Sequence, residues 1–317
     1  MARVAIVIVT YNSAAEIGAC LDALAGLAEG DAEILVVDNA STDSTRDEVV
    51  ARNIRSKVTL IANRANAGFA AALNQGVRAT EAPLILSLNP DAHLVRGLDA
   101  MAALLEKPGT GAVGGTLVGD DGQPQAGFMA RNLPTPATLI FEVLGMNRLW
   151  PGNPVNWHYR CLGLDPMTLA RVDQPAGAFL MFSRASWEVV GGFDDRFWPI
   201  WFEDVDFCAR IKAAGYCTYY HPGAVAKHSG SHAAGRLALE NRERYWYGSL
   251  LKYAARHFRS PAFRTICAAV VLGAVVRAVR GFPRNGFKAF AVYGGIVGLA
   301  LGRAFRSAEH PGKCCLI

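Results

Sequence analysis

The stretch Pro83-Leu-Ile-Leu-Ser-Leu-Asn-Pro-Asp91 decides the fold that we expect for this chain. Leu84 to Leu88 is apolar apart from one serine, which is too short for a helix and typical of a strand buried in a parallel sheet. Because proline cannot donate to a sheet ladder, the strand must end at Asn89-Pro90. Asp91 therefore lies where open α/β sheets bind ligands, at the carboxyl end of a strand. The alternative is an ordinary turn in which Asn89 and Asp91 bond only their own backbone.

Three strands and two clear helices are predicted on the amino-terminal side of this stretch. The strands are Val4–Val9, Glu33–Val37 and Val58–Ala62, and the helices are Ala14–Leu24 and a small-residue helix that runs from Gly68 to about Ala79. Asn12 or Ser13 is placed to cap the first helix. Strands and helices that alternate at this spacing form right-handed βαβ units with a parallel sheet.

The loops after these strands carry polar residues suited to a nucleotide. Asp38 ends the second strand and is followed by a polar loop, an arrangement that can hold a ribose or a base edge. Gly68 allows close approach of a ligand, and the helix amino terminus behind it favours an anion such as a diphosphate. No G-x-x-x-x-G-K-[ST] occurs, and no G-x-G-x-x-G follows the first predicted strand, where the dinucleotide-binding class carries it, so the sequence argues against the P-loop and dinucleotide-binding classes.

The middle of the chain is less regular. Residues 94–118 offer a helix and an apolar segment, whereas residues 119–173 are rich in Gly, Pro, Asn and Trp. We expect residues 119–173 to be a variable loop region that serves as a lid or as part of an acceptor pocket. A strand is predicted again after Gln174, followed by a short helix that ends at Gly191-Gly192.

Two adjacent acids, Glu203 and Asp204, begin the next predicted helix, in which Asp206 and Arg210 form an i,i+4 ion pair. Three aromatic residues precede the acids: Trp198, Trp201 and Phe202. Acids in a partly desolvated, aromatic setting are candidates for a general base with a raised pKa. The alternative is favourable charge at a helix amino terminus.

Cysteine and histidine give no sign of a zinc site. Seven cysteines include no C-x-x-C pair, which argues against a zinc ribbon or a disulfide framework and fits a reducing compartment. His228 and His232 follow a predicted strand but lack a third soft ligand.

The tail differs in charge from the rest. From Arg244 onward the chain has twelve Lys and Arg residues against a single acid, Glu309, a net +11, whereas residues 1–243 carry a net −6. This asymmetry predicts an anionic surface as partner. The tail's aliphatic runs would find no partner on a phosphate backbone, so we expect a membrane and no nucleic acid.

Two apolar runs in the tail, Ile266–Val276 and Ala289–Gly302, are framed by basic residues. With eleven and fourteen residues they fall short of the ~20 needed to span hydrocarbon. We expect amphipathic helices that lie in an anionic leaflet. The alternative is a pair of ordinary core helices that pack on the rest of the protein.

Several motifs occur together in one order along residues 3–232. They are Thr10-Tyr11-Asn12, Asp38-Asn39-Ala40-Ser41-Thr42-Asp43, Asn66-x-Gly68-Phe69, Asn89-Pro90-Asp91, Gly191-Gly192-Phe193-Asp194, Glu203-Asp204-Val-Asp206 and His228 with Gly230. This ordered set resembles the inverting family 2 glycosyltransferases of the GT-A fold, especially their bacterial, rhamnosyltransferase-like branch.

The resemblance implies an α/β fold with a Rossmann-like, mostly parallel central sheet, and it implies roles for individual residues. Thr10, Tyr11, Asn12 and Asp38 would hold the nucleoside, and Asn66, Gly68 and Phe69 would lie against the diphosphate-sugar. Asp91 and His228 would bind Mg²⁺ or Mn²⁺. Asn89 departs from the Asp-x-Asp pattern and would belong to the nucleotide-sugar-binding residues, not to the metal ligands. Asp204 would be the catalytic base, with Glu203 supporting the site or the acceptor.

The resemblance also implies a domain plan and a substrate class. We expect a catalytic domain over residues 1–235, divided near residue 118 into a nucleotide-sugar half and an acceptor half, and a basic helical tail over 236–317. The donor would be a nucleotide sugar, dTDP-rhamnose foremost, and the acceptor a lipid-linked or cell-envelope glycan at the cytoplasmic face of a bacterial inner membrane.

Two other functions are compatible with parts of the pattern. A nucleotidyltransferase on a similar sheet would need a basic, glycine-rich loop after the first strand, which Thr10-Tyr11-Asn12-Ser13 does not provide. A membrane-docked module that binds nucleotide sugars without turnover would share most of the motifs.

Overall fold

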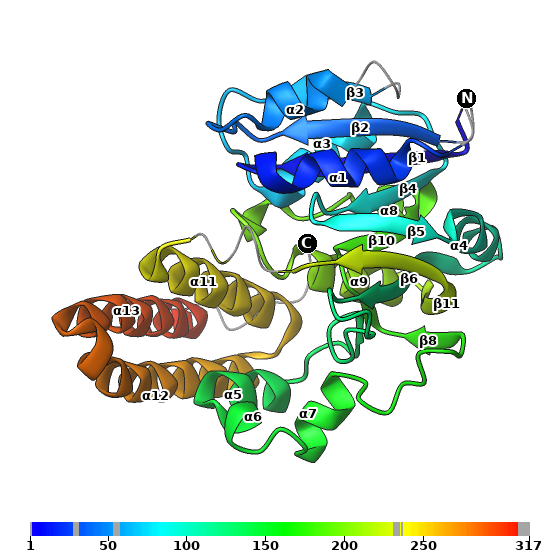
Figure 1. The fold of residues 1–317 in the computed structure, drawn as a ribbon. Coiled ribbons are helices and arrows are strands. Elements are labelled where there is room, and N and C mark those ends of the chain that lie inside the picture. The colour runs from blue at the N-terminus through cyan, green and yellow to red at the C-terminus, as the bar shows by residue number, and fades with distance from the viewer. Residues whose placement is uncertain (1, 28–31, 53–57, 231–234, 236, 310–317) are drawn as a thin grey trace. The chain divides into compact units, whose positions relative to one another are not determined.

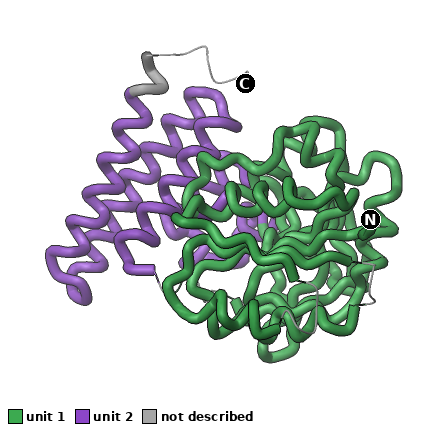
Figure 2. The backbone as a smooth tube through the Cα atoms, turned by 90° about the horizontal axis from the view of Figure 1, so that it is seen from above, with its two compact units in different colours: residues 1–133, 160–199, 203–236 green, residues 134–159, 200–202, 237–317 purple. Residues whose placement is uncertain are grey.

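The computed structural model describes residues 2–27, 32–52, 58–230, 235 and 237–309. These residues form two compact units (Figure 2). The first unit comprises residues 1–133, 160–199 and 203–236, and the second comprises residues 134–159, 200–202 and 237–317. His232 and Arg236 lie outside the described residues. The predicted domain boundary near residue 235 stays a prediction.

The first unit contains a sheet of nine strands within the described residues (Figure 1). Its order is β3-β2-β1-β4-β10-β6-β11-β5, and β8 pairs with β11. The strands are β1 (Val4–Thr10), β2 (Ala32–Asp38), β3 (Val58–Ala62), β4 (Leu84–Leu88), β5 (Ala92–Arg96), β6 (Thr110–Val118), β8 (Ala170–Val172), β10 (Phe179–Ser183) and β11 (Cys217–His228). The pairs among β1, β2, β3 and β4 are parallel, and so is the pair of β6 with β11. The expected α/β fold, with parallel pairing among its first four strands, is therefore confirmed.

Helices cover both faces of this sheet because strand side chains alternate between the two faces. Ile6 and Ile8 of β1 pack with α1 (Ala14–Leu24), α2 (Thr45–Arg52) and α4 (Leu98–Leu105). Ala5 and Val7 point to the other face, where α3 (Phe69–Arg78), α8 (Arg184–Val189) and α9 (Glu203–Ala213) supply the opposing apolar side chains. The predicted bounds of α1 and β3 are confirmed.

Capping of α1 differs from the prediction. Ser13 occupies the N-cap position, but its hydroxyl makes no capping bond and instead accepts a hydrogen bond from Tyr11 N at 3.3 Å. Asn12 Oδ1 accepts from Thr42 N at 2.8 Å. The first helical N–H, that of Ala14, donates to Asp43 Oδ2 at 3.2 Å. A carboxylate from the next loop therefore caps the helix and ties the first two βα loops together.

The segment predicted as a variable loop contains regular elements. In the first unit, β7 (Ala130–Arg131) pairs with β9 (Gln174–Pro175) as a short antiparallel ribbon. In the second unit the same segment supplies α5 (Pro136–Leu144), α6 (Met146–Leu149) and α7 (Pro154–Tyr159). The prediction of a loop from composition was therefore wrong for α5. Its capping box at Thr135 and Thr138 marks the start of a helix.

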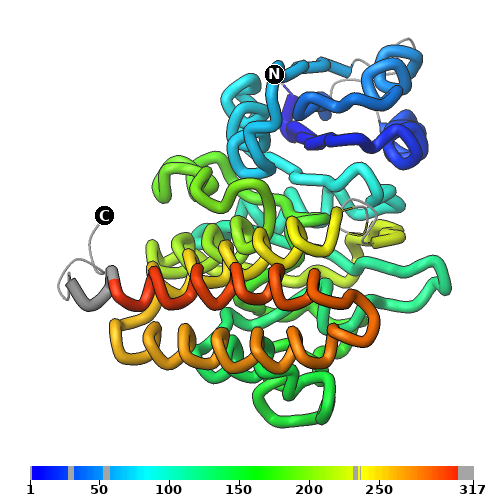
Figure 3. Tube along the Cα trace, turned by 90° about the vertical axis from the view of Figure 1, so that its left-hand side faces the viewer, coloured from blue at the N-terminus to red at the C-terminus, as the bar shows by residue number. Residues whose placement is uncertain are grey.

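The second unit is helical, and its long helices are α11 (Leu239–His257), α12 (Ser260–Asn285) and α13 (Phe287–Glu309). The helices α12 and α13 lie side by side, as the orange and red tubes of Figure 3 show. Helix α5 packs closely on α12, since a Cβ at Gly273 would lie 2.1 Å from Val143 O.

The predicted apolar runs of the tail lie within longer helices. By length and composition alone, α12 and residues 287–305 of α13 are long and apolar enough to cross a membrane, a test that a buried core helix also passes. The two apolar runs are too short to span a membrane, as predicted. The helices that contain them are longer, because the helical backbone continues through the flanking residues.

Candidate active site

The predicted turn after β4 is present. Ala92 N donates to Asn89 O at 3.0 Å, which closes a β-turn with Pro90 at its second position. The chain then continues directly into β5, which the sequence did not predict. Because β5 pairs with β11 and places Ala92 opposite His228, the turn brings Asp91 and His228 together.

Asp91 and His228 form the candidate metal site. Asp91 Oδ1 lies 3.7 Å from His228 Nε2, and the two side chains are almost fully buried. A carboxylate oxygen suits Mn²⁺ and Mg²⁺, and an imidazole nitrogen suits transition-metal ions, so this pair would hold a divalent cation. Within the described residues, no group of three or more His, Cys, Asp and Glu could hold a metal. Asp91 and His228 are therefore a pair of candidate ligands and not a complete metal site.

Asn89 is bonded through its backbone. Its backbone N–H donates to Ala178 O at 3.0 Å, and its carbonyl accepts the turn bond from Ala92. These bonds hold the turn in place without using the side-chain amide. The predicted role of Asn89 in nucleotide-sugar binding stays a prediction.

The predicted nucleoside residues meet at the carboxyl ends of β1 and β2. Thr10 and Asp38 are paired in register, and Thr10 Oγ1 donates to Asp38 Oδ1 at 3.1 Å. Asp38 is fully buried and also accepts from Ser41 N at 3.1 Å and from Arg46 Nε at 2.5 Å. Arg46 is a partner that the sequence analysis missed, since its helix shows no local sign of contact with Asp38. Tyr11 remains 44% exposed beside this cluster.

A second network joins the loops after β2 and β3. Asn39 Nδ2 donates to Asn66 Oδ1 at 3.0 Å and to Gly68 O at 3.1 Å, and Asn39 Oδ1 accepts from Ala67 N at 2.9 Å. The predicted residues Asn66 and Gly68 are thereby held against the β2 loop. Asn39 lay within a quoted motif but was not among the predicted site residues.

Gly68 and Phe69 lie under a segment from far along the chain. Phe69 N donates to Pro199 O at 2.8 Å, and a Cβ at Gly68 would lie 2.8 Å from Trp198 Cδ1. Gly68 has a φ of +88°, which an L side chain rarely adopts. Glycine is therefore required here both by backbone conformation and by the close indole.

Asp204 is held by donors on both oxygens. Oδ2 accepts from Gln174 Nε2 at 2.9 Å and from Gly177 N at 3.1 Å, while Oδ1 accepts from Val205 N at 2.8 Å. Burial raises the pKa of Asp204, and the bonds from Gly177 and Val205 oppose that rise. The sequence analysis missed Gln174 and Gly177, which reach Asp204 only because β9 ends beside the start of α9.

Glu203 differs from its neighbour. It is 6% exposed, and within the described part of the chain its Oε2 atom has no hydrogen-bond partner. Burial, and then the charge of Asp204, raise the pKa of Glu203 well above its ordinary value. A buried carboxylate oxygen without a donor disfavours the charged form, whereas Asp204 has donors on both oxygens, so Glu203 is the more easily protonated member of the pair. The adjacent residues Trp201 and Phe202 have positive φ angles of 78° and 69°, a strained conformation that is common at functional sites.

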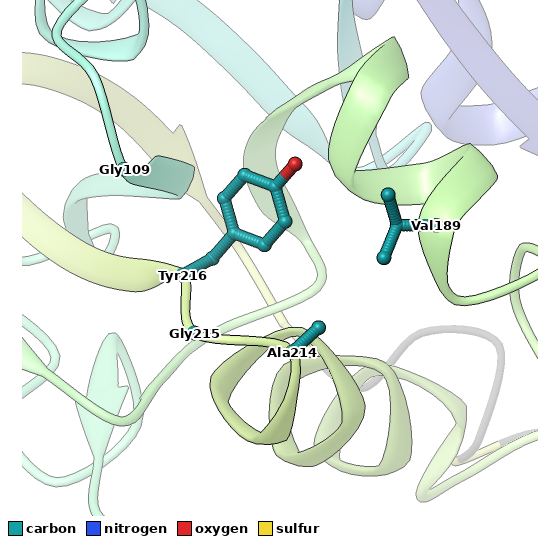
Figure 4. A pocket seen from close by; sticks show the side chains of 5 residues that line it. All are labelled: Gly109, Val189, Ala214, Gly215 and Tyr216. Atoms are coloured by element: carbon teal, nitrogen blue, oxygen red, sulfur yellow. The ribbon is translucent and has the colours of Figure 1, made fainter.

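A surface cavity lies elsewhere on the first unit. It has a volume of about 290 Å³ and is lined by Gly109, Val189, Ala214, Gly215 and Tyr216 (Figure 4). Gly109 and Tyr216 precede β6 and β11, so the cavity lies at the amino ends of these strands, whereas His228 ends β11. It contains none of the predicted site residues.

Comparison with known proteins agrees with this architecture. Residues 5–167 match the family model of glycosyl transferase family 2, and residues 168–230 match that of the N-terminal domain of galactosyltransferase. Over 284 residues, which cover 84% of this chain and 90% of the relative, the sequence is 29% identical to N-acetylglucosaminyl-diphospho-decaprenol L-rhamnosyltransferase of Mycobacterium tuberculosis.

Solved structures share the fold at low sequence identity. One is a mannosyltransferase from Pyrobaculum calidifontis in complex with GDP-Man and Mn²⁺, with a TM-score of 0.53, 19% identity and coverage of 98% of this chain and 86% of that one. Another is TarS 1–349 of S. aureus in complex with UDP-GlcNAc, with a TM-score of 0.52, 14% identity and coverage of 97% and 92%. Since the first family model spans more than half of the 317 residues, the chain belongs to glycosyl transferase family 2.

Proposed function

We propose that this glycosyltransferase moves a sugar, L-rhamnose foremost, from a nucleoside diphosphate to a hydroxyl of a lipid-linked cell-envelope glycan, with inversion at the anomeric carbon. The observation that carries the proposal is that the first unit holds two candidate groups of different chemistry. Asp91 and His228 form one, and Asp204, held by three donors, forms the other. The rhamnosyltransferase activity in the name of the mycobacterial relative supports the choice of donor and acceptor.

The nucleotide half of the site is preorganised by the chain itself. Asp38 is buried and bound by Thr10 and Arg46, so its loop is held in place before the donor binds. No side chain caps α3 at Gly68, so the diphosphate would lie against those amides of its first turn that Pro199 O does not occupy. In this proposal Tyr11 lies against the base, and Asn12 shapes the loop around it.

Asp91 and His228 would hold Mg²⁺ or Mn²⁺. Such an ion, when bound, neutralises charge on the leaving diphosphate. Both ligands are backed by the protein, since Asp91 O accepts from Ser229 N at 3.3 Å and the imidazole stacks on Phe128 at 5.3 Å. The site is therefore shaped by the end of β11 and by the turn after β4.

Asp204 would take the proton from the acceptor hydroxyl. Its raised pKa brings it nearer to neutral pH, where a general base is most effective, while its donors still keep it ionised. Glu203 stays neutral and can offer a hydrogen bond to the acceptor. A single base together with a cation-bound leaving group gives one displacement with inversion, whereas a retaining hydrolase requires two carboxylates that flank the sugar bond.

The second unit would dock the enzyme on an anionic membrane, at the cytoplasmic face. Exposed apolar side chains follow one side of α12 at helical spacing: Leu272, Val275, Val276, Val279 and Phe282. Arg280 and Arg284 are exposed on the same helix. Burial of this stripe at the lipid interface is favourable, and each nearby cation adds about 1 kcal/mol on an anionic leaflet.

Sugar transfer by purified full-length protein tests the proposal. With Mn²⁺, a panel of nucleotide sugars that includes dTDP-rhamnose and a lipid-diphosphate acceptor, the wild type should transfer sugar. Asp204→Asn should bind the donor normally and turn over roughly a hundredfold or more slowly. Asp91→Ala should weaken both Mn²⁺ and donor binding.

Three results would contradict it. Full turnover by Asp204→Asn would move the base to Glu203. Activity that survives both EDTA and Asp91→Ala would make the site metal-free. Donor binding without turnover under any condition would favour a non-catalytic module.

A further inference from the structure

The side chain of Gln125 makes two hydrogen bonds to His228. Gln125 Oε1 lies 2.9 Å from His228 Nδ1, and Gln125 Nε2 donates to the backbone carbonyl of His228 at 2.8 Å. Gln125 is itself held in place, because its N–H donates to Leu117 O at 2.8 Å near the end of β6. Gln125, which follows β6 in the chain, is therefore hydrogen-bonded to both the ring and the backbone of His228.

These two bonds determine which ring nitrogen carries the proton. A backbone carbonyl can only accept, so the amide nitrogen of Gln125 must face it, and Oε1 must then face the ring. Because Oε1 can only accept, His228 Nδ1 must be the donor. In a neutral imidazole the other nitrogen, Nε2, then bears the lone pair, and this is the atom 3.7 Å from Asp91 Oδ1.

The plane of the ring is held by a second contact. Phe128 stacks on His228 with ring centroids 5.3 Å apart and an angle of 6° between the planes. The guanidinium of Arg131 lies 5.5 Å from the centre of the Phe128 ring. With the face of the ring against Phe128 and its Nδ1 edge against Gln125, the imidazole points Nε2 towards the carboxylate.

We propose that Gln125 is a positioning residue for the divalent cation: it holds His228 in the tautomer and orientation in which Nε2 can bind the ion beside Asp91. This inference rests on the proposed function, in which Asp91 and His228 are the metal ligands. Loss of a partner that orients a metal-bound histidine typically weakens metal binding 10- to 100-fold.

Binding of Mn²⁺ to the full-length protein, followed by the EPR signal of the free ion, tests the proposal. Gln125→Leu, which keeps the side-chain size and removes both bonds, should bind Mn²⁺ about 10- to 100-fold more weakly than wild type. The matched control is Gln123→Leu, an exposed glutamine two residues away, which should bind as wild type does.

The ¹⁵N spectrum of histidine-labelled, metal-free protein gives an independent readout, with the His228 signals assigned by their loss in His228→Ala. Wild type should show the Nδ1–H tautomer at His228, and Gln125→Leu should show a mixture. Gln125→Glu keeps an acceptor for Nδ1–H and should restore the wild-type tautomer, which also covers the case that the leucine variant does not fold.

The outcomes separate this inference from the proposed function. Equal Mn²⁺ affinity in wild type and Gln125→Leu, with binding lost in His228→Ala, would overturn the role of Gln125 and leave the proposed metal ligands intact. A wild type that binds no Mn²⁺, or a His228→Ala variant that binds it normally, would overturn both.

Discussion

Asp204 Oδ2 accepts a hydrogen bond from the backbone N–H of Gly177 at 3.1 Å. A Cβ at residue 177 would lie 3.0 Å from Asp204 Cβ and 3.1 Å from Oδ2. The candidate base therefore rests on a backbone position where no side chain fits without movement. Hydrogen bonds from backbone amides stabilise the ionised form without requiring a second charge.

Gly177→Ala should therefore reduce turnover while leaving donor binding nearly unchanged. The added methyl group pushes Asp204 by a few tenths of an ångström, and displacement of a catalytic group by even ~1 Å can cost about a hundredfold in rate. We expect a fall in kcat of roughly 3- to 30-fold on that scale. Steady-state kinetics with varied donor would check it, with Gly26→Ala as the control for loss of a glycine, since a Cβ there would meet no atom within 4 Å. A wild-type kcat for Gly177→Ala would contradict the proposed role of this contact.

The activity should fall towards acid pH at a value above the ordinary Asp pKa of 3.8. Burial raises the pKa of Asp204, so protonation removes the base at a higher pH than it would for an exposed aspartate. The charge of Arg131 opposes this rise. Arg131→Gln should therefore move the acid limb of kcat/KM to still higher pH. An acid limb at or below pH 3.8, or one unmoved in Arg131→Gln, would contradict this assignment.

Glu203→Gln should stabilise the fold at neutral and alkaline pH. Because burial raises the folded pKa of Glu203 above its unfolded value of about 4.5, its contribution to stability is present below that value and is lost as the pH rises through the folded pKa. The neutral amide avoids that loss. The Tm difference between variant and wild type should therefore grow as the pH is raised from 4.5, as measured by thermal unfolding across pH. A constant or shrinking difference would show that Glu203 is ionised in the folded protein.

Membrane docking should depend on the stripe along α12. The full-length double variant Leu272→Gln/Val279→Gln removes two exposed apolar side chains and changes only residues of the second unit. It should co-sediment with anionic liposomes at low salt less than wild type does, because apolar burial drives interfacial binding. The matched control is Val50→Gln/Val189→Gln, which changes two exposed valines of the first unit. If all three proteins sedimented equally, or if wild type did not sediment at all, the proposed role of the α12 stripe in membrane docking would be wrong.

The sequence determined the elements whose signals are local. Val58–Ala62 and Ala14–Leu24 were predicted with the bounds that the structure shows, since β-branched runs and helical periodicity act over a few residues. The ion pair of Asp206 with Arg210 was predicted for the same reason and lies at 2.7 Å. The order of the motifs along the chain also predicted the glycosyltransferase family correctly.

Tertiary structure alone decided which polar residues meet. Ala92–Arg96 is a strand only because β11 pairs with it, and that pairing is what places His228 beside Asp91, 137 positions away along the chain. Gln125 lies in a stretch rich in glycine and proline, where no sequence motif predicts a function for it. In the structure its side chain makes two hydrogen bonds to His228. Sequence patterns report periodicity within one element, whereas these contacts depend on register between elements, which the packing of the whole sheet sets.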